Sequence, residues 1–360
     1  MKIRKLFLKA VFPFLLCAAF LISSCAKDEN PVEPVDPPPP PAGPDTVSRY
    51  IWKLVPINLT PGDLYAADTN NVYIIGGIWA YSILLFYDGV TCTQYNLSDP
   101  DFYPRKVYGF DKNNIFVSGT KRIINSNTYR PVLKKITFGT ITNYTIVDTV
   151  VSINDLLVTG VNQAWLCEAN RGFAYYFDNG TINKYELQGS DSIQPLKFYL
   201  SPDNNLFLFA KSQKTTGLFY SYKFENGGFV NVETDCYGDF PCNTNCIFRC
   251  GKDVIMTTRN NTCGTKYFNG NEWVYHAFLD SVWAPFMKLG GISKDSLVGL
   301  NFNESIYTFG GNKWRKENNS PMFPLTIYES LHNLEFSTGR VYFTFTGEFG
   351  SLVIGTPNKK

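Results

Sequence analysis

Short apolar runs recur along residues 49–360 at a nearly constant interval. Each run follows polar turn residues and is rich in β-branched and aromatic side chains, as in NNVYIIGG, NNIFVSG, NQAWLCE and NNLFLFA. Neighbouring runs start 42 to 49 residues apart, at Val72, Ile115, Ala164, Leu206, Val254, Leu297 and Val341. This spacing indicates one structural unit repeated seven times.

Each unit contains further runs around that one. A short apolar run precedes it, as in KVYGFD; an aromatic-rich run follows it, as in YYFDNG; and a fourth run comes after a glycine turn, as in WVYHAF. Four short strands in about 40 to 50 residues are typical of one β-propeller blade, and Asp-Gly or Asn-Gly suits the tight turn between two strands. We therefore predict an all-β, seven-bladed β-propeller, with two stacked β-sandwiches as the alternative.

The last unit contains only three such runs before the chain stops at Lys360. The missing strand is present at the other end of the body, where Tyr50–Val55 is apolar and aromatic. We expect this segment to pair with Ser351–Gly355 and to complete the seventh blade. Such closure joins the two ends of the ring and removes exposed strand edges.

Some units resemble Kelch-like and sialidase-repeat-like bacterial propellers. The resemblance rests on the Gly76-Gly77 pair and on a Gly-x-x-Trp turn, which occurs at Gly270–Trp273 and at Gly311–Trp314. The Asp-box of sialidases is absent, and only one blade has the glycine pair in the Kelch position. The resemblance implies a propeller fold and transfers no catalytic residue.

The N-terminus has the features of an export signal. Lys2, Arg4, Lys5 and Lys9 precede or interrupt an apolar stretch that ends in LISSC, which resembles a bacterial lipobox. We predict a signal peptide over residues 1–24 and acylation of Cys25 with chains such as palmitate. The alternative is an ordinary signal peptide in which Cys25 is incidental.

Residues 25–45 have the composition of a tether. Cys25–Asn30 (CAKDEN) resembles the signal that sends lipoproteins of Bacteroidetes-type bacteria to the outer face of the outer membrane; a generic polar leader is the alternative. Pro37–Pro41 favours polyproline II, a stiff spacer between the lipid and the propeller at 46–360. We therefore expect a lipid-anchored protein of the outer membrane that is exposed at the cell surface.

The charge of the chain argues against nucleic-acid binding. The sequence has 33 Lys and Arg against 31 Asp and Glu, and removing residues 1–24 leaves 29 basic residues against 31 acidic ones. Hence there is no basic excess to neutralise phosphates. The chain also lacks G-x-S-x-G, H-E-x-x-H, P-loop and Rossmann motifs, and we expect structural roles for His276 and His332. No cofactor or metal is predicted.

The cysteines suggest disulfides, which an exported protein can form. Propeller connectivity brings four of them to one face, and we expect two disulfides among these: Cys236, Cys242, Cys246 and Cys263. Cys92, Cys167 and Cys250 are expected to remain thiols. A metal site is the alternative, but the C-x3-C-x3-C spacing lacks the tight pairs of zinc sites.

Aromatic and acidic residues are concentrated in the expected loops between strands and blades. Because aromatic rings can stack on sugars and carboxylates can accept their hydroxyl protons, we predict a ligand site there. Its candidate residues are Trp79, Tyr81, Tyr103, Tyr237, Asp239, Phe240, Trp283 and Phe286. Packing of these side chains onto the blades is the alternative for each.

Together these patterns predict a monomeric surface module that binds a glycan or a protein. The alternatives are a propeller enzyme acting on glycans and a structural component of an envelope complex. Fold alone does not choose among them.

Overall fold

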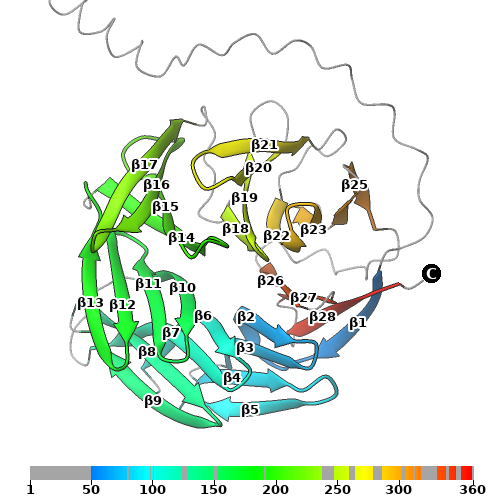
Figure 1. The fold of residues 1–360 in the computed structure, drawn as a ribbon. Coiled ribbons are helices and arrows are strands. Elements are labelled where there is room, and N and C mark those ends of the chain that lie inside the picture. The colour runs from blue at the N-terminus through cyan, green and yellow to red at the C-terminus, as the bar shows by residue number, and fades with distance from the viewer. Residues whose placement is uncertain are drawn as a thin grey trace, which may run out of the picture. The chain divides into compact units, whose positions relative to one another are not determined.

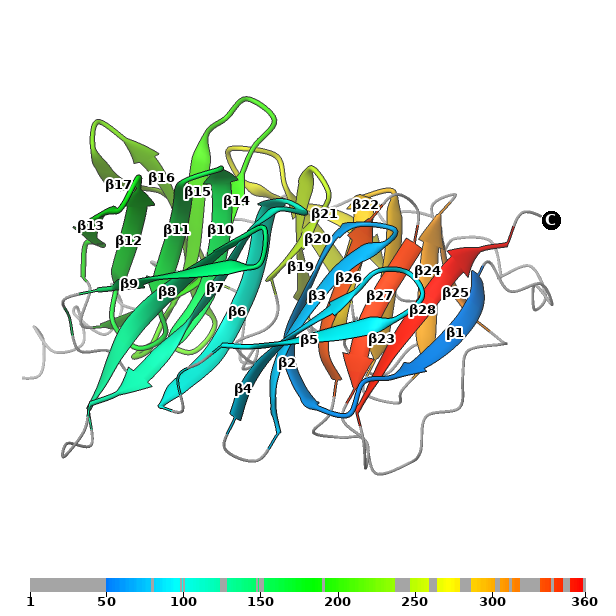
Figure 2. The same ribbon diagram turned by 90° about the horizontal axis from the view of Figure 1, so that it is seen from below.

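The computed structural model describes residues 50–358 except for several short segments, namely 79–80, 98, 100, 124–127, 147, 149–151, 190–191, 237–246, 259–263, 279–285, 302–304, 311–312, 318–330, 338–339 and 346–349. Thr46–Lys360 forms one compact unit. The described residues build seven four-stranded antiparallel sheets arranged in a ring (Figures 1 and 2). The predicted seven-bladed propeller is confirmed. Within the described part, no helix has the length and apolarity needed to cross a membrane.

In blades 1 to 6 the strands run outward from the centre of the ring in chain order, and in blade 7 the N-terminal strand is the outermost one. Blades 1 to 3 consist of β2 (Thr60–Asp68), β3 (Asn71–Ile78), β4 (Tyr81–Tyr87) and β5 (Cys92–Asn96); β6 (Phe102–Asp111), β7 (Asn114–Arg122), β8 (Tyr129–Thr137) and β9 (Thr140–Thr145); and β10 (Ile153–Gly160), β11 (Gln163–Glu168), β12 (Phe173–Asp178) and β13 (Thr181–Glu186).

Blades 4 to 7 continue this order. They consist of β14 (Ile193–Leu200), β15 (Leu206–Ser212), β16 (Leu218–Glu225) and β17 (Gly228–Cys236); β18 (Ile247–Cys250), β19 (Asp253–Thr258), β20 (Gly264–Phe268) and β21 (Trp273–Phe278); β22 (Phe286–Ser293), β23 (Ser296–Asn301), β24 (Ile306–Gly310) and β25 (Lys313–Lys316); and β26 (Leu331–Ser337), β27 (Arg340–Phe345), β28 (Ser351–Pro357) and β1 (Tyr50–Pro56).

The N-terminal strand closes the ring as predicted. β1 pairs antiparallel with β28 over its whole length, from Tyr50 opposite Pro357 to Pro56 opposite Ser351. The Trp52 ring lies against Gly355, where an added Cβ would be 2.5 Å from Trp52 Cζ3. The first blade contacts the last through β2 and β26.

The two ends of the ring differ in the connections that they carry. The hairpin face carries the turns between first and second strands and between third and fourth strands. The loop face carries the second-to-third-strand loops and the connections between blades. On the hairpin face, Asn179-Gly180 and Asn226-Gly227 both have positive φ, which explains the recurring Asn-Gly pairs of the sequence.

Most innermost strands contain a β-bulge near the loop face. In β2 and β6 the bulge follows a proline, Pro61 or Pro104, which cannot donate a ladder hydrogen bond. Gly76 lies opposite Pro61 and Gly119 lies opposite Pro104. At either glycine a Cβ would lie 2.2 Å from a backbone carbonyl oxygen of the bulged strand, so these blades require glycine there.

Tyrosine hydroxyls join neighbouring blades at the hairpin face. Tyr342 Oη of blade 7 donates to Thr69 O of blade 1 at 2.9 Å, and Tyr199 Oη of blade 4 donates to Lys252 O of blade 5 at 2.9 Å. Tyr73 donates in the same way to Lys112 O. These contacts orient adjacent blades, whose apolar cores lie between the sheets.

Candidate functional site

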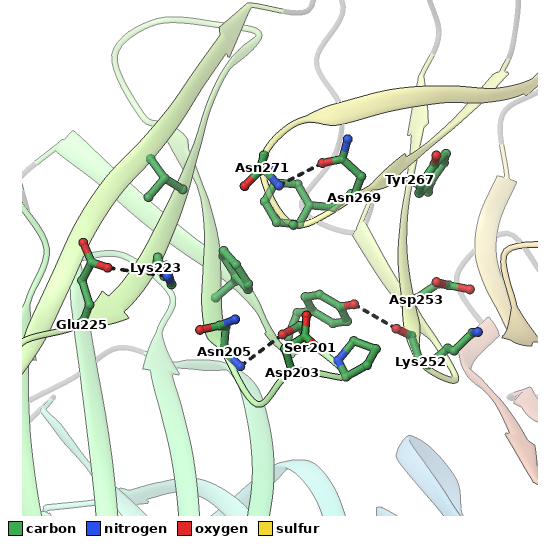
Figure 3. A pocket seen from close by; sticks show the side chains of 16 residues that line it. Ser201, Asp203, Asn205, Lys223, Glu225, Lys252, Asp253, Tyr267, Asn269 and Asn271 are labelled. Atoms are coloured by element: carbon green, nitrogen blue, oxygen red, sulfur yellow. Dashed lines mark hydrogen bonds and ion pairs between the residues drawn. The ribbon is translucent and has the colours of Figure 1, made fainter.

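A groove of about 670 Å³ lies between blades 4 and 5 and opens on the hairpin face (Figure 3). Turns of both blades form its walls: Ser201–Asn205 joins β14 to β15, and Asn269–Asn271 belongs to the turn between β20 and β21. The polar residues that line it are Ser201, Asp203, Asn205, Lys223, Glu225, Lys252, Asp253, Asn269 and Asn271.

Aromatic side chains form the floor of the groove. Tyr199, Phe207 and Phe268 are each at most 5% exposed, and Phe207 and Phe268 pack edge to face at 5.0 Å between ring centroids. Burial, followed by the charges of Asp253 and Asp203, raises the pKa of Tyr199 to about 12. Tyr199 therefore stays protonated and keeps its hydrogen bond to Lys252 O. These rings provide a rigid floor but no open stacking surface.

Some polar groups of the groove maintain its shape. Asn269 Oδ1 accepts hydrogen bonds from the backbone of Asn271 at 2.9 Å and of Glu272 at 3.0 Å, as an Asx turn does. Asp253 Oδ2 accepts from Lys294 N of blade 6 at 2.6 Å. Lys223 Nζ lies 3.6 Å from Glu225 Oε2.

Other polar groups of the groove remain available to a ligand. Within the described part of the chain, the side chains of Asp203, Asn205, Lys252 and Asn271 have no hydrogen-bond or ion-pair partner. They present amide donors and acceptors, a carboxylate and an ammonium group. The groove carries charges of both signs, so its lining is suited to a polar ligand of low net charge.

The structure spreads the predicted ligand residues over different environments. Tyr103 in β6 is 44% exposed and packs edge to face against Tyr129 at 6.1 Å. The prediction that Phe286 lies in an inter-blade loop is wrong, because it begins β22, is 3% exposed and packs 4.5 Å from the Trp314 ring. The predicted loop placement is also wrong for Tyr103, which lies in β6, and for Tyr81, whose backbone begins β4. Trp79, Tyr237, Asp239, Phe240 and Trp283 lie outside the described residues.

The predicted disulfides cannot be followed through the described residues. Cys242, Cys246 and Cys263 lie outside them, and the backbone of Cys236 ends β17. Cys92 and Cys167 are thiols, exposed and buried respectively. Burial, followed by the charge of Asp155, raises the pKa of the Cys167 thiol, which keeps it in the neutral, unreactive form. The pairing of the other four stays a prediction.

His276 has a structural environment. Its Nε2 lies 2.7 Å from Lys294 O, and its ring packs edge to face against Phe309. Burial lowers its pKa, which favours the neutral ring. In the part of the chain that the structure describes, no group of three or more His, Cys, Asp or Glu side chains could hold a metal ion.

The groove was not predicted from the sequence, because its residues have the composition of ordinary turns. Ser201-Pro202-Asp203-Asn204-Asn205 and Phe268-Asn269-Gly270-Asn271 are ordinary turn sequences. The available signal was topological: hairpin turns of consecutive blades meet at the same end of a propeller. The turns of blades 4 and 5 therefore could have been assigned to one site.

Comparisons with known proteins support the fold. Virginiamycin B lyase from Staphylococcus aureus is 16% identical, with a TM-score of 0.58 over 86% of this chain and 100% of that chain. YCF48 from Cyanidioschyzon merolae is 15% identical, with a TM-score of 0.60 over 85% of this chain and 98% of that chain; YCF48 has also been solved bound to D1 peptide. No protein-family model and no curated protein sequence matches the chain. These identities show the fold alone.

Proposed function

We propose that this protein is a binding module, held at the cell surface by a lipid on Cys25, that takes a saccharide in the groove between blades 4 and 5. The observation that supports the ligand site is the set of side chains at Asp203, Asn205, Lys252 and Asn271, which have no partner among the residues that the structure describes. Sugar hydroxyls can donate to Asp203 and can both donate to and accept from the amides. The mixed charges of the groove favour a ligand that is neutral or nearly so.

Substitutions in the groove test this proposal. Asp203→Ala and Asn271→Ala should each weaken binding of any saccharide found on a glycan array about tenfold, since each removes hydrogen bonds worth about 1.5 kcal/mol. Isothermal titration calorimetry measures the change. Tyr103→Ala on the loop face is the matched control and should bind as wild type does. If Tyr103→Ala loses saccharide binding while Asp203→Ala and Asn271→Ala bind as wild type does, the ligand site lies on the loop face and the groove proposal is contradicted.

A peptide array run in parallel addresses the other ligand class, because YCF48, a propeller of similar fold, has been solved with a peptide. If the protein binds peptides but no saccharide, and the same groove variants weaken that binding, the groove is still the ligand site but its ligand is a peptide. Absence of binding on both arrays would contradict a ligand-binding role for the groove.

The proposed anchor is testable separately. Its support is the LISSC sequence followed by a charged and proline-rich segment. Cys25→Ser should abolish incorporation of an alkyne-tagged palmitate and release the protein from membranes, because the acylated thiol is lost. Cys92→Ser, which changes an exposed cysteine of the propeller, is the control and should still incorporate label. Unchanged labelling of Cys25→Ser would contradict the anchor. Protease treatment of intact cells tests surface exposure.

A further inference from the structure

The centre of the ring is lined by ionisable side chains that sequence analysis did not identify. Five of the innermost strands carry one such residue directly after the β-bulge: Asp63 in β2, Lys106 in β6, Asp155 in β10, Lys197 in β14 and Lys288 in β22. In three of these strands the residue follows proline by two positions, as Pro61-Gly62-Asp63 shows. The repeat thus places charges at one level around the axis of the ring, and we call the ring of these five residues the central channel.

Four of the five residues form two similar pairs across neighbouring blades. Lys106 Nζ lies 3.7 Å from Asp63 Oδ1, and Asp63 Oδ2 accepts a hydrogen bond from Val107 N at 3.0 Å. Likewise Lys197 Nζ lies 3.1 Å from Asp155 Oδ1, and Asp155 Oδ2 accepts from Phe198 N at 2.9 Å. Both carboxylates are therefore neutralised by a lysine and held by backbone of the following blade.

Arg249 adds a further cation to this level. It comes from β18 in blade 5, and its guanidinium donates to Asp155 Oδ2 at 3.0 Å and to Leu156 O at 3.1 Å in blade 3. The guanidinium also lies 4.7 Å from the Tyr108 ring centroid in blade 2. Asp155 thus serves two cations, Lys197 and Arg249.

Lys288 is the cation that has no such counter-charge. Within the described residues it forms no ion pair or hydrogen bond, although it is half-buried. Burial lowers its pKa to about 7; Lys106 and Lys197 act in the same direction and Asp63 opposes them. The described channel therefore holds four basic side chains against two carboxylates, both of which are already engaged, and near neutral pH Lys288 carries its charge only part of the time.

We propose that the central channel is a binding site for a small oxyanion, a carboxylate or phosphate group, held by Lys288 together with Lys106 and Lys197. An oxyanion would supply the missing negative charge and accept charge-assisted hydrogen bonds from the ammonium groups. This site lies apart from the groove residues and does not rest on saccharide binding there.

Lys288 is half-buried, and the ammonium groups of Lys106 and Lys197 are accessible to a small ligand. The side chains of Lys106 and Lys197 are 28% and 21% exposed, although each belongs to an innermost strand. Partial exposure lets a ligand reach them, while the surrounding protein weakens competition from water and strengthens the attraction between opposite charges. The excess of cations favours an anion here, in contrast to the mixed charges of the groove.

Titration of the purified protein with sodium phosphate and, separately, sodium acetate tests the site. At constant ionic strength set with sodium chloride, we expect at least one of them to raise the melting temperature in a saturable manner. Lys288→Met should weaken that binding tenfold to a hundredfold, as the loss of a charge-assisted hydrogen bond predicts. Lys106→Met provides a second variant that also loses a channel cation.

Lys214→Met is the control, since it removes an exposed lysine of the turn between β15 and β16 and leaves both the channel and the groove unchanged. It should bind phosphate or acetate as wild type does. Saturation by phosphate alone or by acetate alone supports the site and identifies the group that it prefers. Saturation by neither salt, or equal affinity in Lys288→Met, Lys106→Met and wild type, would overturn the proposal. Saccharide binding is measured independently, so failure at either site leaves the other result standing.

Discussion

Deletion of Tyr50–Pro56 is expected to lower the free energy of unfolding by on the order of 4 kcal/mol and the melting temperature by roughly 10 °C. The deletion removes the strand that pairs with β28 from Ser351 to Pro357, along with the partly buried rings of Tyr50 and Trp52. It also leaves β28 as an exposed edge. Thermal unfolding followed by circular dichroism measures the change. Deletion of residues 46–49, which precede β1, is the control and should leave the melting temperature unchanged.

A double-mutant cycle tests how β1 docks. Gly355→Ala places a Cβ 2.5 Å from Trp52 Cζ3, so the ring must move and stability should fall by about 1–3 kcal/mol. In a Trp52→Ala background the same change should cost much less, because the ring is absent. Equal effects of Gly355→Ala in both backgrounds would contradict the contact between β1 and β28 as the origin of the loss.

Asp155→Asn is expected to destabilise the protein by about 3 kcal/mol, because it leaves Arg249 and Lys197 without their shared carboxylate. Asp155 is completely buried and accepts hydrogen bonds from Arg249 and from Phe198 N. Chemical denaturation measures the loss. Glu225→Gln is the matched control: it breaks the partly exposed pair with Lys223, for which less than about 1 kcal/mol is expected.

Acid should reduce the difference in the free energy of unfolding between Asp155→Asn and wild type. Burial alone would raise the pKa of Asp155, but Arg249 and Lys197 outweigh burial and hold the pKa below its ordinary value. A carboxyl group with a lowered pKa stabilises the folded state above its unfolded pKa, near 3.9, and loses that contribution as pH falls through its folded pKa. Wild type should therefore approach the variant in stability below about pH 4. If the two proteins differ in the free energy of unfolding by the same amount from pH 7 to pH 3, the ion pairs of Asp155 do not stabilise the fold.

The predicted strands and Asn-Gly turns of the blades, which depend on local sequence, agree with the structure. The repeated runs and Asn-Gly turns identified the blades, since strand propensity and left-handed turn residues act within a few positions. Phe286 shows where such reasoning failed. An aromatic residue near a blade boundary can belong to a loop or to the first position of a strand, and only its packing against Trp314 distinguishes the two.

The sequence by itself determined the all-β class, the seven units and the segment that closes the ring, because period, length and strand count are properties of the chain read in order. Tertiary structure alone decided which residues form the groove and the charged channel. Asp155 and Arg249 are 94 residues apart, and they meet because innermost strands of different blades face one axis. Residues at equivalent positions of a repeat converge only when the ring closes, so their charges could be read from the sequence but their pairing could not.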